Sequence, residues 1–294
     1  MADHTYRPPS AARARLKALP FLGPGTLFLF VFMAIPVALL LVYSFFTRGR
    51  FGGVEFVFTT DNFAKLLEPV YLSVIAQSVG VALAVTILAL LLGYPIAYAI
   101  TRLPERWRTV ALIAVVLPFW TNFLIRTYAW ILLLNNAGIV NQSLMGLGII
   151  DAPLPLLYNW GTVAVGLLYM YLPLMILPLY ASLQAVDPAL REAATNLGST
   201  PWRVFRTITL PLSLPGALTG AIFVFVPSMS NFVIPELLGG GKMILIGNLI
   251  RDQFLEARNW PFGATLALVL TAFLAILIVG QNWVSRRLTE GGKS

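Results

Sequence analysis

The segment that decides the fold runs from Asp187 to Gly216 and reads DPALREAATNLGSTPWRVFRTITLPLSLPG. Asp187 is a good helix N-cap, and Pro188 suits the first helical position because its missing N–H has no helical partner there. Gly198 can adopt the left-handed conformation that ends a helix. Thr200 and Pro201 repeat the cap-and-proline start. The segment therefore predicts a helix over Ala189–Leu197, a glycine turn, and a second short helix over Trp202–Ile208.

The composition of the whole chain places this polar segment in a membrane protein. Of 294 residues, 58% are hydrophobic and only 11% are charged, whereas a soluble protein carries about 25% charged residues. The net charge of +8 is spread over the loops, so we interpret it as a signal for membrane topology and expect no nucleic-acid partner. The chain has no cysteine, which excludes a disulfide framework and a thiolate metal site.

Six hydrophobic stretches are long enough to cross a membrane, which takes about 20 mainly apolar residues. No period-2 alternation supports a barrel, and helices are then the structure that satisfies backbone groups in lipid. The sequence predicts an all-α membrane protein with spans at Phe21–Phe46, Leu72–Ile100, Val110–Leu134, Thr162–Leu183, Leu210–Leu238 and Phe262–Val284.

The distribution of basic residues predicts the orientation of these spans. With the N-terminus inside, the inner segments hold most of the 20 lysines and arginines, as the positive-inside rule requires. We therefore expect both termini and the Asp187–Gly216 segment to be cytoplasmic. The expected organisation is an N-terminal tail over residues 1–20, one transmembrane domain over 21–285 and a C-terminal tail over 286–294. The run after residue 20 is too long for a signal peptide.

The fifth span is the most irregular. Four prolines punctuate it, and its outer half carries Asn231, Phe232 and Glu236. Glu236 is the one carboxylate that we place within or at the edge of a span, and an intramembrane acid indicates a functional site. The alternative is a structural ion pair with Arg126 or Lys242. Gly216 and Gly220 form a small-xxx-small pattern that lets another helix approach closely.

The third span carries a second group of polar and aromatic residues. Arg126 lies eight residues before the end of the apolar run, where an arginine snorkels, pairs or faces a wet cavity. Trp120, Asn122 and Tyr128 lie beside it in the sequence. They fit either an interfacial aromatic belt or the lining of a solute path.

Residues for enzyme chemistry are scarce. The chain has one histidine, His4 in the tail, so a histidine-based triad cannot form, and we expect no catalytic residue and no metal site. The run Gly239–Lys242 resembles a phosphate loop only superficially, since Glu236 stands where its first glycine should be and Met243 where Ser or Thr is required. We therefore expect no cofactor in this chain; if ATP drives the protein, other subunits bind it with Mg²⁺.

The Asp187–Gly216 segment also resembles a known family motif. It is similar to the cytoplasmic EAA loop of ABC importer permeases in both residue types and spacing. The matching residues are Glu192-Ala193-Ala194, Gly198 four positions after Ala194, and, after nine intervening residues, Ile208-Thr209-Leu210-Pro211. The resemblance implies the type I ABC importer permease (MetI-like) architecture and a coupling loop over 187–211 that docks on a separate ATP-binding subunit. The residues assigned to coupling are Glu192, Ala193, Ala194, Gly198, Arg203, Ile208 and Pro211.

Longer stretches, including LPFWTNFLIRTYAWILLLNNAGIVN from Leu117 to Asn141, resemble the permeases of spermidine/putrescine ABC importers. That resemblance implies a multi-pass subunit of the bacterial inner membrane, in contact with lipid. Its implied partners are a second six-helix permease, two ATP-binding subunits and an extracytoplasmic solute-binding protein. The second permease is either another copy of this chain or, as is usual in the subfamily, a different chain. The residues assigned to the solute path or gate are Glu236, Phe232, Asn231, Trp120, Asn122, Arg126 and Tyr128. Alternatives are an importer of another small solute, such as an amino-acid derivative or opine, a passive channel, and an intramembrane enzyme.

Overall fold

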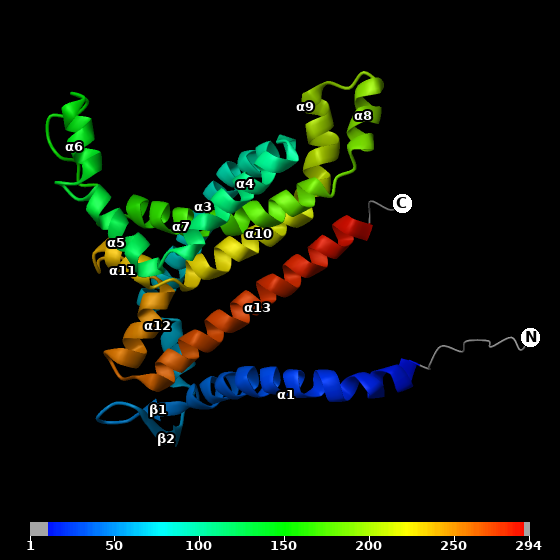
Figure 1. Cartoon of the computed structure of the whole chain (residues 1–294). Helices are drawn as coiled ribbons and strands as arrows, with labels where there is room; N and C mark the ends of the chain where they lie inside the picture. The colour runs from blue at the N-terminus through cyan, green and yellow to red at the C-terminus, as the bar shows by residue number, and fades with distance from the viewer. Residues whose placement is uncertain (1–10, 291–294) are drawn as a thin grey trace, which may run out of the picture.

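The computed structural model describes the backbone of residues 11–290 and is mostly helical (Figure 1). The predicted tails fall partly outside this range, at residues 1–10 and 291–294. The long helices are α1 (Ala11–Tyr43), α3 (Pro69–Arg102), α7 (Trp160–Gln184), α10 (Leu210–Ser230) and α13 (Trp260–Glu290). The shorter helical elements are α2 (Asp61–Leu66), α4 (Glu105–Val116), η1 (Leu117–Trp120), α5 (Phe123–Leu134), α6 (Ile139–Gly146), α8 (Pro188–Asn196), α9 (Pro201–Val204), η2 (Phe205–Thr209), α11 (Val233–Gly239) and α12 (Ile246–Leu255).

Six of the described segments are long and apolar enough to cross a membrane, which confirms the expected number of spans. Their bounds are Gly23–Tyr43, Pro69–Arg102, Phe123–Gly146, Trp160–Gln184, Pro201–Ser230 and Trp260–Ser285. Helix also extends into both predicted tails, since α1 begins at Ala11 and α13 continues to Glu290.

The third span differs from the prediction of one helix over Val110–Leu134. The chain breaks after η1, where Thr121 and Asn122 are extended, and α5 begins at Phe123. The Asn122 side chain accepts hydrogen bonds from the backbone N–H groups of Leu124 and Ile125, at 2.8 and 3.4 Å. Because this cap satisfies the free N–H groups of a new helix, it lowers the free-energy cost of breaking the span here. Pro118, inside η1, cannot donate a helical hydrogen bond and favours the interruption.

The fifth span also differs from its predicted bounds, Leu210–Leu238. Helix α10 ends at Ser230, and the extended Asn231 separates it from α11. The Asn231 side chain accepts a hydrogen bond from Ile234 N–H at 2.9 Å and so helps to begin α11. Pro215 and Pro227, two of the four prolines that make the span irregular in sequence, do not interrupt the helix and both lie inside the continuous α10.

A small β-hairpin, which holds all the strands of the described residues, was not expected. Strands β1 (Phe46–Arg48) and β2 (Val54–Phe58) pair antiparallel, with Phe46 opposite Phe58 and Arg48 opposite Val54. The predicted first span therefore ends at Tyr43 rather than Phe46. The hairpin lies at the same end of the molecule as α6, α11 and α12, whereas the start of α1, the end of α13 and the α8–α9 hairpin lie at the other end (Figure 1).

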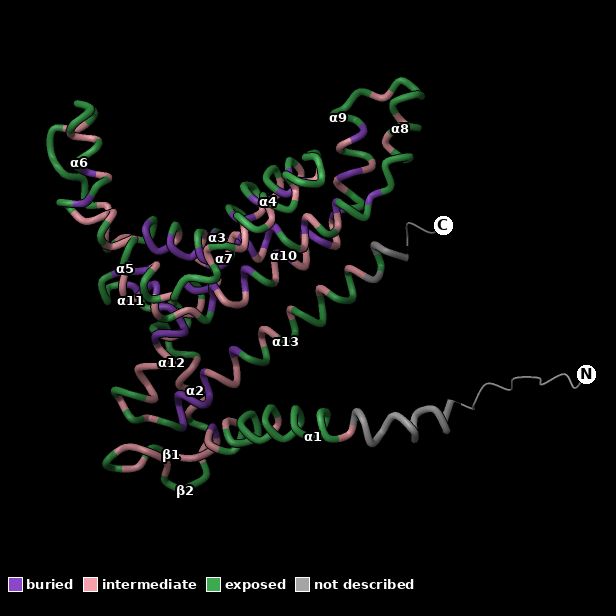
Figure 2. The backbone as a smooth tube through the Cα atoms, viewed as in Figure 1, coloured by how far each residue is buried: buried purple, intermediate pink, exposed green. Residues whose placement is uncertain are grey.

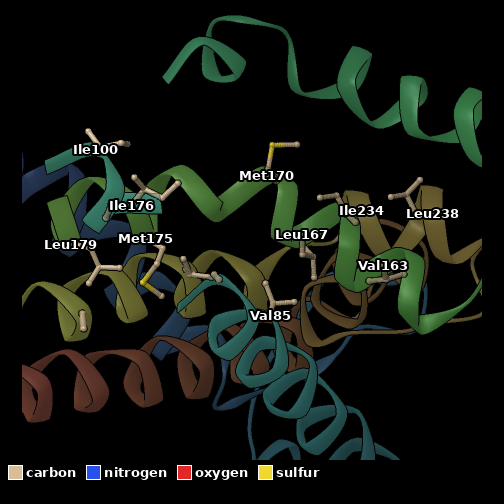
Figure 3. Close-up of a cluster of buried hydrophobic side chains, with 14 of the residues drawn as sticks. Val85, Ile100, Val163, Leu167, Met170, Met175, Ile176, Leu179, Ile234 and Leu238 are labelled. Carbon is tan, nitrogen blue, oxygen red and sulfur yellow. The ribbon is translucent and has the colours of Figure 1, made fainter. Parts of the chain in front are cut away.

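The core lies where α7 packs against α3 and α10. Fully buried side chains from these helices include Val85, Leu167, Met175 and Leu179, and Ile234 and Leu238 of α11 close the cluster at one end (Figure 3). In contrast, the span in α1 has no buried residue and contacts mainly α13 (Figure 2). The burial of α3, α7 and α10 makes them the rigid centre of the chain.

Two glycines of α10 allow its backbone to lie directly against α7, as the small-xxx-small pattern predicts. A Cβ atom on Gly216 would come within 2.4 Å of Ser182 Cβ and 2.6 Å of the Pro178 carbonyl oxygen. A Cβ atom on Gly220 would lie 2.7 Å from Met175 Sδ and 3.0 Å from its carbonyl oxygen. Since the carbonyl oxygens belong to backbone, a side chain at either position forces the helices apart.

We predict that Gly216→Ala lowers the thermal stability of the purified protein, by about 1–3 kcal/mol, because the added methyl overpacks the α7–α10 contact. The matched control is Gly80→Ala in α3, where an added Cβ meets nothing within 4 Å. That change should be neutral or stabilise the helix by up to about 1 kcal/mol. Thermal unfolding followed by tryptophan fluorescence measures both variants. Equal midpoints would contradict the close-packing role of Gly216.

Candidate functional site

The predicted coupling segment forms the helix–turn–helix that its sequence indicates. Asp187 caps α8 by accepting a hydrogen bond from Ala189 N–H at 2.9 Å, and Thr200 caps α9 by accepting one from Arg203 N–H at 3.4 Å. Gly198 has φ +81° and lies between the two helices. A Cβ atom there would meet nothing within 4 Å. The preference for glycine at this turn therefore comes from the left-handed backbone and not from a close neighbour.

The second helix of the segment does not end at Ile208 as predicted. Helix α9 continues through the π-helical turn η2 into α10, so that Pro201–Ser230 is helical without interruption. Pro211 lies in the first turn of α10. Its missing N–H is accommodated by the wider π turn just before it, where Leu210 N–H bonds to the Phe205 carbonyl. The turn at Gly198 is thus joined to the membrane core by one helix of 30 residues.

Helix α8 has no buried residue, although it is strongly amphipathic (Figure 2). Ala189, Ala193 and Leu197 follow one another at a spacing of four and lie on one exposed face, with Leu197 87% exposed. Glu192 and Arg191 instead face an open hollow of about 680 Å³ between α8, α9 and the end of α3. The predicted coupling residues all lie on this hairpin or at the start of α10. Glu192, Ala193, Gly198, Arg203 and Pro211 are exposed, and Ala194 and Ile208 are half-buried.

A second group of polar residues gathers where α10 ends, at the opposite end of the molecule, and we call it the α11–α12 polar cluster. It consists of Tyr171, Asn231, Phe232, Glu236, Asn248 and Arg251. Asn231 donates from Nδ2 to the Tyr171 hydroxyl at 2.8 Å. Buried Asn248 donates from Nδ2 to the Phe232 carbonyl at 2.9 Å and to Glu236 Oε2 at 3.3 Å. The cluster therefore joins α7, the break after α10, α11 and α12.

Glu236 forms an ion pair, but not with either partner considered from the sequence. Its Oε2 atom lies 3.2 Å from Arg251 Nη2, so the alternatives Arg126 and Lys242 were wrong. Arg251 also contacts Asp252 at 2.7 Å and Glu256 at 3.6 Å, and its guanidinium lies 6.0 Å from the centroid of the Phe232 ring. A hydrogen bond to Asp252 raises the pKa of Arg251 above its ordinary value, so Arg251 stays charged. Carboxylates and an aromatic face thus surround one cation.

Helix α12 holds this cluster against the rigid core. Ile246 N–H donates to the Ser78 hydroxyl of α3 at 2.8 Å. A Cβ atom on Gly247 would lie 2.4 Å from the Ser230 carbonyl oxygen, so α12 touches the end of α10 directly. These contacts pack the amphipathic segment after Gly239 over the spans. A displacement of α10 would reach the α11–α12 polar cluster through this contact.

The remaining predicted path residues lie on η1 and α5. Trp120 and Tyr128 are 78% and 54% exposed, and Asn122 serves as the helix cap described above. Arg126 stacks near Phe119, with 5.8 Å between the guanidinium carbon and the ring centroid. The structure does not bring these four residues into the α11–α12 polar cluster by any hydrogen bond or ion pair among the described residues.

The sequence prediction missed Tyr171, Asn248 and Arg251. Asn248 and Arg251 are three residues apart in an amphipathic segment, a spacing that places two side chains on one helical face. That signal was present, but Arg251 was interpreted only as a charge that sets topology. Tyr171 had no local signal, because its hydroxyl gains a role only when α7 meets Asn231.

The comparisons with known proteins agree with this geometry. Residues 23–290 match the family model described as binding-protein-dependent transport system inner membrane component. The chain therefore belongs to this family: it is a multi-pass inner-membrane transport permease, a non-catalytic subunit of an ABC importer. Together with the six spans, this confirms the predicted class and location.

Two relatives and one solved structure illustrate the similarity. The spermidine/putrescine transport system permease protein PotB of Salmonella typhimurium strain SL1344 is 41% identical over 266 residues, covering 90% of this chain and 92% of the relative. PotB of Escherichia coli K12 is 40% identical over 266 residues, covering 90% and 96%. A chain in the crystal structure of a bacterial ABC transporter that imports alginate has a TM-score of 0.72 at 19% identity, covering 94% and 97%, which supports the fold alone.

Proposed function

We propose that this chain is the permease subunit of a polyamine importer, which carries spermidine or putrescine. The observation that carries the proposal is the identity of 40–41% to PotB permeases along nine-tenths of the chain. We further propose that it works with a second, different permease, two ATP-binding subunits that hold ATP and Mg²⁺, and an extracytoplasmic binding protein. Transport would occur by alternating access, with no nucleotide bound by this chain itself.

The α8–α9 hairpin is the proposed docking element for an ATP-binding subunit. Helix α8 is too short to be stable by itself in water and buries no residue against its own chain. Its exposed alanine and leucine face is narrow enough for another subunit to approach closely. We assign coupling to Glu192, Ala193, Ala194, Gly198, Arg203, Ile208 and Pro211, which lie on this hairpin or at the start of α10.

The uninterrupted helix Pro201–Ser230 is the proposed lever. Its 30 residues span about 45 Å at the α-helical rise. Because Gly216 and Gly220 lock it against α7, a push at the α9 end tilts the helix rather than compressing it. The opposite end touches α12 and the α11–α12 polar cluster, so we propose that docking movements open or close the route there.

The α11–α12 polar cluster is the proposed outer gate for a cationic solute. Its carboxylate Glu236, the neighbouring Asp252 and Glu256, and the Phe232 ring are groups that bind an ammonium ion, and Arg251 already occupies them. A polyamine that replaces the guanidinium would meet the same partners. Asn231, Phe232 and Glu236 are assigned to this gate, and Trp120, Asn122, Arg126 and Tyr128 remain assigned to the path on the α5 side.

We predict that both termini and the α8–α9 hairpin face the cytoplasm, as the distribution of basic residues indicates. The chain has no native cysteine, so single-cysteine labelling has no background. In intact cells, an impermeant maleimide should leave Ser199→Cys unlabelled. It should label Phe51→Cys, in the hairpin loop at the opposite end and 91% exposed. The reverse pattern would overturn the orientation.

We predict that Gly198→Val uncouples ATP hydrolysis from uptake, because a side chain at φ +81° costs about 1–2 kcal/mol and distorts the turn. Gly198→Asn is the matched control, since asparagine tolerates the left-handed conformation and the site has free space. The measurement is solute taken up per ATP hydrolysed in proteoliposomes. An unchanged ratio in Gly198→Val would remove the coupling role.

We predict that Glu236→Gln lowers ATP-driven spermidine uptake about tenfold, because it removes a charge-assisted contact with the solute. Assembly should persist, since Arg251 keeps Asp252 and Glu256 as partners. Glu256→Gln, at a carboxylate side chain 71% exposed, is the control for loss of one charge near Arg251.

Radiolabelled uptake into vesicles measures these variants. An excess of an opine or amino-acid derivative added as competitor identifies another cargo if it, and not putrescine, blocks uptake. Wild-type uptake by Glu236→Gln would show that the pair with Arg251 is structural only.

A further inference from the structure

Arg126 is the described side chain whose charge is least compensated. Its Nε and Nη1 atoms are buried and have no hydrogen-bond partner. The Phe119 ring at 5.8 Å is the one ring contact found for its guanidinium, and no carboxylate lies within 4 Å among the described residues. A guanidinium partly removed from water without an acceptor is unfavourable. Arg126 is half-buried and Nη2 is not among its buried atoms, so Nη2 is the nitrogen through which an acceptor from outside this chain can pair with Arg126.

The described spans offer no carboxylate to Arg126. The six candidate spans of the described residues contain neither aspartate nor glutamate. Glu236 is engaged by Arg251 and Asn248. Arg126 also lies in the first turns of α5, where the helix dipole adds positive potential instead of offsetting the charge.

The surface beside Arg126 is exposed and apolar. Ile125 and Leu132 are 67% and 68% exposed, Leu124 is 48% exposed, and Trp120 and Tyr128 extend the same region of η1 and α5. Ile125, Tyr128 and Leu132 recur at spacings of three and four and form one face of α5. We call Trp120, Leu124, Ile125, Tyr128 and Leu132 the α5 face. Because the unpaired Arg126 lies at the edge of this apolar face, the surface is suited to contact a protein partner that carries an acidic side chain.

We propose that the α5 face is the contact with the second permease and that Arg126 pairs there with a carboxylate on a membrane segment of that subunit. This inference rests on the second permease of the proposed function and adds which surface binds it and by what charge. It also selects the partner. A second copy of this chain would bring the same patch across a two-fold interface and no carboxylate from its spans, so the partner must be a different chain.

The pair also resolves a conflict in the proposed route. A free Arg126 would repel a polyamine, whereas a neutralised one would not. The acid that neutralises Arg126 therefore serves both assembly and passage of the cation.

The test is co-purification of the two permeases through a tag on this chain. Arg126→Glu should reduce the recovered partner permease about 30-fold or more, because removing one member of a buried charge pair leaves the other unpaired. Arg126→Lys should retain most of it. Arg50→Glu, the same charge change at an exposed loop residue, should have no effect. The acids in the partner's spans are then changed to arginine one at a time and each is combined with Arg126→Glu. One of these charge-swapped pairs should restore assembly, and it identifies the acid that pairs with Arg126.

A photo-crosslinking amino acid at Ile125 or Tyr128 should form an adduct with the partner permease, and one at Ile276 of α13, 70% exposed, supplies the comparison for a residue on another helix. Adducts to lipid alone at Ile125 and Tyr128 would overturn the inference. So would normal assembly of Arg126→Glu, or a loss confined to uptake by an intact complex. If the wild-type chain recovers no second permease of any kind, the result contradicts the proposed function, and with it the inference that rests on it. If it recovers one that transports another solute, the inference still stands.

Discussion

The close contact between α10 and α7 is the constraint on which the rest of the structure depends. At Gly216 and Gly220 the two backbones approach so closely that a Cβ atom on α10 has no space. Such contacts let helices associate where lipid is as apolar as their side chains. Because α3 and α11 complete the same buried cluster, this contact fixes the line of α10 through the molecule.

Helix α10 connects two regions that differ in burial: one is exposed and the other is packed against the core. At one end, α8 and its turn are exposed, amphipathic and without buried residues, so their conformation is held by caps and by the φ of Gly198. At the other end, buried Asn248 and the Arg251 ion pairs form a connected polar network against the core. An exposed hairpin and a well-packed polar cluster joined by one helix are mechanically linked, so a movement of α10 at either end reaches the other.

Several surfaces of this chain expose apolar or charged groups that have no partner within the described residues. The α1 span, the α5 face and α8 all leave apolar side chains exposed, and Arg126 leaves a charge without an acceptor. Lipid can cover the apolar side chains of the spans, whereas the exposed apolar face of α8 and the unpaired charge of Arg126 are unfavourable for an isolated subunit. Together they describe one component of a larger assembly, which agrees with the family to which the chain belongs.

The sequence by itself determined what depends on local chemistry: the number of spans from apolar length, the hairpin from Asp187, Gly198 and Thr200, and the close approach at Gly216 and Gly220. It also identified Glu236 as a residue with an electrostatic role. Only the tertiary structure decided that Glu236 pairs with Arg251, that the fifth span breaks at Asn231 rather than at its prolines, and that α9 runs into α10 without a stop. These outcomes depend on side chains far apart in the sequence, such as Tyr171, Ser78 and Asn248, and on a π turn that absorbs the missing N–H of Pro211. Contacts between distant residues form only when the helices pack, so they cannot be predicted from local sequence patterns.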